Sequence, residues 1–336
     1  MELPSASEFD FKRLAKAALA SPLPYAMLTA RALRKSPITV LCYHTIRPDN
    51  DPIDAWTAVR RSDFVRQMEF LHARYDIVSL DDAFNDGAMP GERPRAVITF
   101  DDGEVGLCDS LLPLVSEMRL PVTLYVATGQ IEAGRAYWFD DVMNALQADG
   151  TFTIDLQAAG LKAWKIGPQR GATRWAAIAD ILNALKGVTP AKRAEVAAAV
   201  VAQAPWRPGS RMFKPLQPMS VTQLQELARN ELVTIAAHSH CHSLLDQIPV
   251  SQVRESVAYS RALLEEWTGR SVKHFAYPNG NHNKSVEEVV AGLGFRSATA
   301  LNDRLWRRGM DHFALPRVSI GRYDDFERFK LRLAEI

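Results

Sequence analysis

Three histidines fall within five residues, at His238, His240 and His242, directly after the apolar run 232–237. His238 and His242 are four residues apart, a spacing that places two imidazoles on one face of a helical turn, as in other two-histidine zinc sites. Neutral imidazole is the commonest nitrogen ligand of metals in proteins. We therefore predict that His238 and His242 bind a metal ion and that His240 points elsewhere.

Two adjacent carboxylates, Asp101 and Asp102, follow the apolar run 96–100 and precede Gly103. Successive side chains at a strand end point in different directions, so one carboxylate can bind a metal while the other takes a proton from water. An Asp-Asp pair alone is more often an ordinary turn. Together with two imidazoles, however, one carboxylate leaves a coordination position open, which is typical of a catalytic zinc-type site.

A third segment, Phe-Ala-Tyr-Pro-Asn-Gly at 275–280, also ends an apolar run. A Pro-x-Gly turn can aim a backbone N–H at a developing oxyanion, as acyl-transfer sites require. The same sequence is a common loop in isolation. Its importance depends on the two motifs described above.

The elements that position these motifs alternate between strands and helices. Short apolar runs rich in β-branched residues suit strands buried on both faces, as in parallel sheets. Helix starts are indicated by Ser62 and by two capping boxes, Ser220 with Gln223 and Ser285 with Glu288. An α/β fold of this kind is either an open doubly wound sheet or a (β/α) barrel, and both gather their chemistry at the carboxyl ends of the strands.

The strand pattern lapses between about residues 131 and 219. One helical stripe is formed by Trp175, Ile178, Leu182 and Leu185. Thr189 followed by proline is typical of the start of another helix. We therefore expect a helical insertion at 131–219 within a main domain that spans 37–336.

Composition limits the class of partner. The 336 residues include 40 basic and 39 acidic side chains, a formal net charge of +1, so no overall field favours nucleic acid. Cys42, Cys108 and Cys241 are widely spaced, which argues against a disulfide framework or a thiolate zinc site. A reducing compartment and no nucleic-acid partner are expected.

Residues 1–36 are expected to form an N-terminal helical segment. They show no basic region followed by an apolar run, so we predict no signal peptide and a cytoplasmic location. No stretch of the chain approaches the ~18 uninterrupted apolar residues of a transmembrane segment. Residues 11–35 can form a basic amphipathic helix. Such helices usually pack on a core, and peripheral membrane contact is the open alternative.

Taken together, the motifs resemble those of the polysaccharide deacetylase family, the NodB-homology or carbohydrate esterase 4 group. Thr-Phe-Asp-Asp-Gly at 99–103 matches the first family motif, and His-Ser-x-x-His at 238–242 matches the second. The segment 275–280 occupies the place of the third. The resemblance runs from about Ile38 to Arg317 and covers the insertion poorly.

This resemblance implies a distorted (β/α)7-type barrel that removes N-acetyl groups from a polysaccharide or oligosaccharide. It implies Asp101 as the general base and a divalent metal, by default Zn²⁺, bound by Asp102, His238 and His242. The backbone N–H of Asn279 would belong to the oxyanion hole. The implied partner is an N-acetylated glycan.

The departures from the family pattern suggest substitutes. Many members have an arginine in the third motif where this chain has Ala276, and Arg317 is our candidate to replace it. A late Leu-x-His motif, whose histidine is the general acid in many relatives, is not evident. Relatives that act on exopolysaccharides tend to show a Tyr-His pair like the one ending at His44. His44 is therefore the first candidate for the acid that protonates the leaving amine, and His312 is the second.

Two aromatic residues, Trp138 and Tyr277, are assigned to substrate binding. Trp138 lies in the insertion and could stack on sugar rings, although aromatic residues more often fill cores. Two other functions stay open: a non-catalytic carbohydrate-binding barrel, and a hydrolase of a non-sugar cyclic amide. The intact Asp101 and Asp102 argue against the first, because a binding module has little need for a base beside an open metal site.

Overall fold

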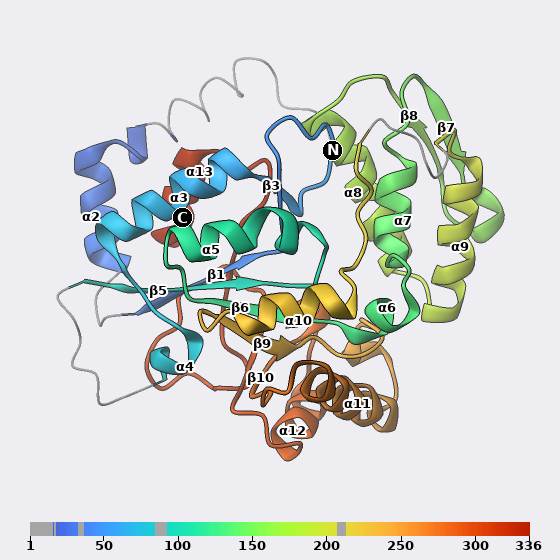
Figure 1. Cartoon of the computed structure of the whole chain (residues 1–336). Helices are drawn as coiled ribbons and strands as arrows, with labels where there is room; N and C mark the ends of the chain where they lie inside the picture. Colours follow the sequence, from blue (N-terminus) through green and yellow to red (C-terminus); the bar gives the residue numbers. More distant parts are fainter. Residues whose placement is uncertain (1–15, 17, 33–36, 85–92, 207–212) are drawn as a thin grey trace.

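A curled parallel sheet forms the centre of the computed structural model, which describes residues 16, 18–32, 37–84, 93–206 and 213–336 (Figure 1). Every pairing in this sheet is parallel. Across the sheet the strands run β11 (Ser297–Thr299), β10 (His274–Ala276), β9 (Val233–Ala237), β6 (Val122–Val126), β5 (Arg95–Phe100), β1 (Ile38–Tyr43) and β12 (Val318–Ser319), with β4 (Asp76–Ile77) paired to β5.

The segment between β11 and β12 brings the two ends of this sheet toward each other. Thr299 of β11 bridges Leu315, and the Ala300 N–H donates to the Leu315 carbonyl at 2.8 Å. The sheet is therefore curled into a half-barrel, and the predicted (β/α) barrel class is confirmed.

Helices of the main domain alternate with its strands, and the start of one was predicted correctly. Ser220 and Gln223 form the expected capping box. The helix near Ser62 begins instead after Arg60, whose side chain makes no capping hydrogen bond, and the helix near Ser285 is capped by the Asn283 side chain. Both of those predictions were therefore wrong. The helices are α2 (Pro22–Ala32), α3 (Arg61–Arg74), α4 (Leu80–Ala83), α5 (Leu112–Glu117), α10 (Val221–Arg229), α11 (Val250–Thr268), α12 (Lys284–Gly292) and α13 (Phe326–Leu333).

Several short elements complete the main domain. They are a two-stranded parallel pair, β2 (Thr45–Arg47) and β3 (Ala58–Arg60), a π-helical turn η1 (Leu107–Leu111), and the 3-10 turns η3 (Leu245–Gln247) and η4 (Pro278–Gly280). Of the expected N-terminal segment, residues 1–15, 17 and 33–36 lie outside the described residues. None of the helices in the described part of the chain combines the length and apolarity needed to cross a bilayer.

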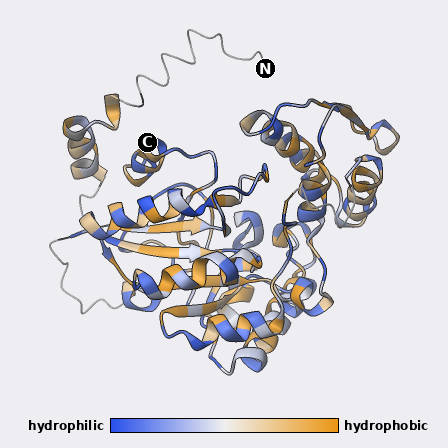
Figure 2. Ribbon diagram, turned by 45° about the horizontal axis from the view of Figure 1, so that its top comes forward, coloured by the Kyte–Doolittle hydropathy of each residue, from blue (hydrophilic) through white to orange (hydrophobic). Residues whose placement is uncertain are grey.

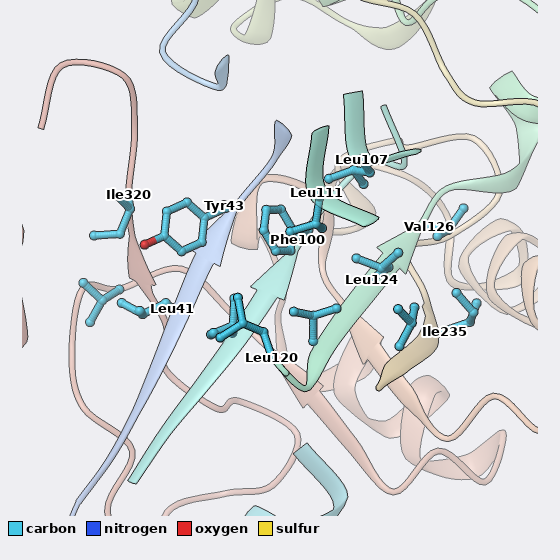
Figure 3. Close-up of a cluster of buried hydrophobic side chains, with 14 of the residues drawn as sticks. Leu41, Tyr43, Phe100, Leu107, Leu111, Leu120, Leu124, Val126, Ile235 and Ile320 are labelled. Carbon is cyan, nitrogen blue, oxygen red and sulfur yellow. The ribbon is translucent and has the colours of Figure 1, made fainter. Parts of the chain in front are cut away.

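The sheet is buried on both faces, as the nearly continuous apolar runs predict. Figure 2 shows largely hydrophobic strands surrounded by helices that have both hydrophobic and hydrophilic faces. Alternate strand residues contact the helices; those labelled in Figure 3 include Leu41, Tyr43, Phe100, Leu124, Val126 and Ile235. The intervening residues form a second apolar cluster with Trp306 and Leu315, and they include Val40, Val97, Tyr125, Ala236 and Ala276. This packing on both sides fixes the strand ends that carry the motifs.

The region 131–219 lies beside the sheet and forms a second hydrophobic core, to which Ile53, Ala55 and Ala58 also contribute (Figure 1). The expected stripe forms α8 (Ala172–Lys186), in which Ile178, Leu182 and Leu185 are buried, and Thr189 precedes α9. An antiparallel hairpin that the sequence did not predict precedes these two helices in the chain. The other elements are α6 (Thr128–Ala133), α7 (Trp138–Ala145), β7 (Phe152–Asp155), η2 (Gln157–Ala159), β8 (Ala163–Ile166) and α9 (Pro190–Gln203).

Candidate metal centre and active-site pocket

The two adjacent carboxylates diverge because the chain turns sharply after β5. Asp102 and Gly103 both have left-handed backbone angles, with φ of 74° and 85°. Tyr137, which is buried, donates its hydroxyl hydrogen to the Asp102 carbonyl at 2.7 Å. A non-glycine residue held at positive φ is strained, and such strain concentrates at functional sites. The turn points the Asp101 and Asp102 side chains toward different partners.

The histidine motif is a loop and not a helical turn, so that part of the prediction was wrong. His238 follows β9 and donates its backbone N–H to the Val126 carbonyl at 3.0 Å. Ser239 and His242 have φ of 63° and 52°, and the His242 N–H donates to the Ser239 hydroxyl at 3.1 Å. Two left-handed residues thus fold the loop back on itself. This brings together imidazoles that we expected a helix to align.

The side chains of three residues converge on one point: Asp102, His238 and His242. Asp102 Oδ1 lies 3.0 Å from His242 Nε2 and 3.5 Å from His238 Nε2. One ligand atom from each residue lies within 4.8 Å of the other two. The Ala276 carbonyl, 2.8 Å from His238 Nδ1, can only accept, so Nδ1 carries the hydrogen and Nε2 offers its lone pair to the cluster.

Burial and charge set the ionisation of this cluster. Burial disfavours the charged form of Asp102, but His242 and His238 beside it hold the pKa of its carboxyl well below the usual range. Burial lowers the pKa of His242, despite the neighbouring Asp102. Burial opposes the charged form of His238, but Asp101 and Asp102 raise the pKa of its imidazole. Metal binding uses the ionised carboxylate and neutral imidazoles, so it would release any proton that His238 holds.

The arginine expected to replace the missing third-motif cation contacts Asp101. Arg317 is fully buried, and its Nη1 and Nη2 donate to the two carboxylate oxygens of Asp101 at 2.6 and 2.7 Å. Nη1 also donates to the Thr99 hydroxyl, and Nε donates to the Ala300 carbonyl. Burial opposes ionisation of Asp101, but Arg317 and His238 lower the pKa of the carboxyl. The bidentate pair holds Asp101 ionised in a single orientation.

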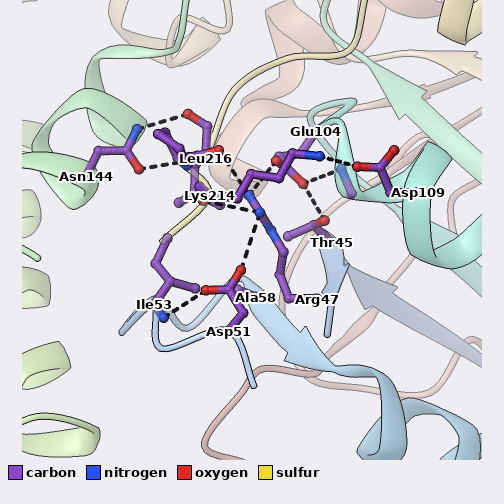
Figure 4. A network of polar contacts seen from close by, with 12 residues as sticks. Thr45, Arg47, Asp51, Ile53, Ala58, Glu104, Asp109, Asn144, Lys214 and Leu216 are labelled. Atoms are coloured by element: carbon purple, nitrogen blue, oxygen red, sulfur yellow. Dashed lines mark hydrogen bonds and ion pairs between the residues drawn. The ribbon is translucent and has the colours of Figure 1, made fainter. Parts of the chain in front are cut away.

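A polar network anchors the loop that follows these carboxylates (Figure 4). Glu104, next after Gly103, accepts from Arg47 Nη2 at 2.7 Å and from the Gly106 N–H. Arg47 also donates to the carbonyls of Lys214 and Pro215, on the segment that returns from the insertion. The buried Arg47–Glu104 pair therefore ties the turn at Asp102 to the region 131–219. Neither residue was singled out from the sequence.

A pocket opens over the candidate metal centre, and its walls come from two parts of the chain. Strand-end loops contribute Asp101, Asp102, His238, His242 and Asn279. The region 131–219 contributes Trp138, Phe139, Met143, Trp175, Leu182, Lys186 and Arg193. Trp138 was predicted as a site residue from the sequence, whereas Lys186 and Arg193 were not. Nothing in the helical pattern shows that their ends of α8 and α9 reach the strand ends.

Three predicted site residues outside the metal cluster, His44, Asn279 and Trp138, line this pocket. His44 packs edge-on against Trp56, with 5.8 Å between the ring centroids, and its Nδ1 is buried without a hydrogen-bond partner. Asn279 lies at the tip of the turn, with φ of 57°. Trp138 is half-buried and has the Arg193 guanidinium 5.6 Å from its ring centroid.

Two predicted residues are misplaced. Tyr277 does not line the pocket. It is fully buried in the core, and its hydroxyl donates to the Phe313 carbonyl at 2.9 Å. His312, the second candidate acid, is exposed and packs against Phe84 and Trp306, apart from the pocket residues. Tyr277 failed as a prediction because a strand-end residue can face either side of the sheet.

Comparison with known proteins finds one family model that matches part of the chain. A model described as polysaccharide deacetylase matches residues 197–298, a range that includes both predicted histidine ligands. No functionally curated protein matches the sequence.

Solved structures of similar fold cover most of the chain. The Streptococcus pyogenes deacetylase PplD in complex with acetate has a TM-score of 0.58 at 15% identity, over 88% of this chain and 98% of that one. IcaB from Ammonifex degensii has a TM-score of 0.57 at 17% identity, over 89% and 97%. A de-N-acetylase from Aggregatibacter actinomycetemcomitans has a TM-score of 0.53 at 15% identity, over 88% and 99%.

At such low identity the structural likeness shows the fold, and the sequence match of the family model is independent of it. The predicted enzyme class, hydrolases of non-peptide carbon–nitrogen bonds, is the class of this family. The family model covers residues 197–298 and the shared fold covers most of the chain, so both comparisons agree with the resemblance to polysaccharide deacetylases that the motifs indicate.

Proposed function

We propose that this protein is a metal-dependent hydrolase that removes N-acetyl groups from a polysaccharide or oligosaccharide. The observation that carries the proposal is the arrangement of two groups in one pocket: the Asp102, His238 and His242 cluster, and the carboxylate of Asp101 held by Arg317. A general base beside an open metal site is what hydrolysis of an amide requires.

The donor set fits a divalent cation such as Zn²⁺. One carboxylate oxygen and two imidazole nitrogens make a three-ligand set of the kind found in catalytic zinc sites, with a position left for substrate or water. The hydrogen bond from His238 to the Ala276 carbonyl directs a lone pair toward the cluster. When bound, the cation would supply Lewis-acid chemistry, polarising a carbonyl and lowering the pKa of water.

In this proposal Asp101 accepts the proton of the attacking water. Because Arg317 lowers the pKa of Asp101, the carboxylate is ionised at neutral pH but is a weak base. Arg317 acts as a positioning residue, since it fixes both carboxylate oxygens without touching the substrate. The backbone N–H of Asn279 would donate to the oxyanion that forms on the acetyl carbonyl.

Protonation of the leaving amine is assigned to His44. It lies in the pocket wall beside Asp101, and its buried Nδ1 has no hydrogen-bond partner. A histidine can change protonation near neutral pH, which suits it to donate a proton to a leaving nitrogen.

The decisive test is release of acetate from an N-acetylglucosamine oligomer. The zinc-loaded protein should release acetate, and removal of the metal with a chelator should stop the reaction until zinc is restored. Binding of the oligomer without acetate release would favour the non-catalytic barrel. Hydrolysis of a cyclic amide in place of the sugar would favour the third function left open by the sequence.

Peripheral membrane contact is a further part of the proposal. Exposed apolar side chains recur at four-residue intervals at Leu19, Leu23 and Met27. Leu23 is 80% exposed and Met27 is 76% exposed. The opposite face of α2 packs on the core through Tyr25, whose ring contacts Phe70. Sedimentation with phospholipid vesicles that is lost in a Leu23→Glu, Met27→Glu variant would support this contact. Absence of sedimentation for the wild-type protein would contradict it, and the cytoplasmic location stays a prediction.

A further inference from the structure

Two cations of the insertion line the same pocket as the catalytic carboxylates. Lys186 ends α8 and is half-buried, and Arg193, on α9, is only 5% exposed. Within the described residues, neither forms an ion pair with an acidic side chain. Burial lowers the pKa of both groups. A cation removed from water without a paired anion is unfavourable, so an anionic ligand would stabilise it.

Hydrogen bonds hold the Arg193 side chain in one orientation and leave its Nη1 available to a ligand. Its Nε donates to the Leu185 carbonyl, and its Nη2 donates to the carbonyls of Lys186 and Val188, which caps the end of α8. Its Nη1 has no hydrogen-bond partner within the described part of the chain. The guanidinium lies against the Trp138 ring in the pocket wall. The capping bonds therefore fix both Arg193 and the helix end that carries Lys186.

Lys186 reaches across the pocket to the third motif. Its ammonium donates one hydrogen bond, to the Asn279 side-chain oxygen at 2.6 Å. An ammonium has three hydrogens, so two remain for a ligand. Because Asn279 belongs to the turn proposed to hold the acetyl oxyanion, a group bound by Lys186 would lie near the reacting acetamide.

The proposed reaction does not need this charge. Asp101 is balanced by Arg317, and Asp102 would be balanced by a bound divalent cation. An acetamido group is neutral. The two insertion cations therefore add positive charge that neither the metal centre nor a neutral N-acetyl sugar offsets.

We propose that the natural substrate carries an anionic group, a carboxylate or a phosphate ester, close to the acetamido group, and that Lys186 and Arg193 bind it. This inference rests on the proposed deacetylation and adds to it the charge of the substrate. Arg193 supplies the two N–H groups of its Nη1 and Lys186 supplies two more, which together suit the several oxygens of such an anion.

The test compares three N-acetylglucosamine oligomers of equal length: neutral, oxidised at C6 to the carboxylate, and phosphorylated at C6. Acetate release by the zinc-loaded wild-type protein gives kcat and KM for each. Lys186→Gln removes the charge but keeps an amide that can bond Asn279, and Lys186→Met removes both. Lys192→Gln is the control, since Lys192 is an exposed residue of α9 whose partner is Glu195, outside the pocket.

The wild-type protein should have a KM about tenfold or more lower for one of the anionic oligomers than for the neutral one, as a charge-assisted hydrogen bond predicts. Both Lys186 variants should lose this preference, whereas Lys192→Gln should retain it and keep the wild-type kcat on the neutral oligomer. The carboxylate and phosphate oligomers tell which anion is preferred. Equal KM for all three oligomers with the wild-type protein would overturn the inference. An equal loss of kcat on all three oligomers in the Lys186 variants would also overturn it, because Lys186 would then act as a proton donor.

Binding to the Asp101→Asn variant separates this inference from the proposed function. Calorimetric binding of an anionic oligomer that weakens in the Asp101→Asn, Lys186→Gln double variant supports the anion site even without any turnover. Binding that is the same for neutral and charged oligomers contradicts it. Absence of acetate release from all oligomers with wild-type protein contradicts the deacetylase function alone.

Discussion

The two walls of the pocket differ in how firmly their side chains are held. At the strand ends, Asp101 and His238 are almost fully buried, and each has a fixed partner, Arg317 or the Ala276 carbonyl. In the insertion wall, Arg193 is also buried and hydrogen-bonded, but Trp138 and Lys186 are half-buried and have few polar partners. Rigid strand ends suit chemistry that depends on exact geometry, and a half-exposed wall suits contact with a variable substrate. Substitutions in the two walls should therefore affect different kinetic constants.

The largest effect should come from a metal ligand. His238→Ala removes one of three ligands, so both bound zinc and acetate release should fall below detection. Metal content by mass spectrometry and acetate release measure the two effects. His240→Ala is the matched control, since His240 contacts the Thr128 hydroxyl and lies outside the cluster. Full zinc content and an unchanged rate of acetate release in His238→Ala would show that the strand-end wall does not carry out the reaction.

The next largest effect should come from the proposed base. Asp101→Asn should lower kcat by ~10²–10⁴-fold, because an amide cannot take the proton, while bound zinc stays unchanged. Steady-state kinetics and metal analysis check this. Asp109→Asn changes a surface aspartate paired with Lys214 and should leave both values unaltered. A near-normal kcat in Asp101→Asn would assign the base elsewhere.

Removal of Arg317 should affect stability. Arg317→Met leaves the Asp101 charge buried without its partner, which should lower the free energy of unfolding by about 3–5 kcal/mol in urea titrations. Adding Asp101→Asn removes the uncompensated charge, so the double variant should be less destabilised than the sum of the two single changes. Wild-type stability in Arg317→Met would show that the pair does not hold the strand ends.

The strand-end wall could be read from the sequence more fully than the insertion wall. Uninterrupted apolar runs that stop at Asp101 and His238 indicate buried parallel strands, whose carboxyl ends meet at one edge. The local geometry of the loop could not be predicted. A four-residue spacing between histidines fits a helical turn, and the residue types of Ser239 and His242 do not indicate the left-handed backbone angles that they adopt. Tertiary packing imposes those angles.

The positions of the insertion-wall residues depend on how the core of the region 131–219 packs against the core of the sheet. The stripe at Ile178, Leu182 and Leu185 predicts a helix and its buried face. It does not predict that Lys186 reaches Asn279, because that contact joins residues 93 positions apart on separate elements. The same limit explains Tyr277, whose place in the third motif indicated the site but whose side chain packs in the core.

The smallest effect should come from the aromatic part of the insertion wall. Trp138→Ala removes a ring on which a sugar can stack, and an aromatic contact contributes about 0.5–1.5 kcal/mol. KM for an N-acetylglucosamine oligomer should therefore rise about two- to twelvefold, with kcat nearly unchanged. Trp138→Phe keeps an aromatic face beside Arg193 and should lose only part of this affinity. A fall in kcat at constant KM would mean that the insertion wall shapes the catalytic geometry as firmly as the strand ends do, and the division between the walls would fail.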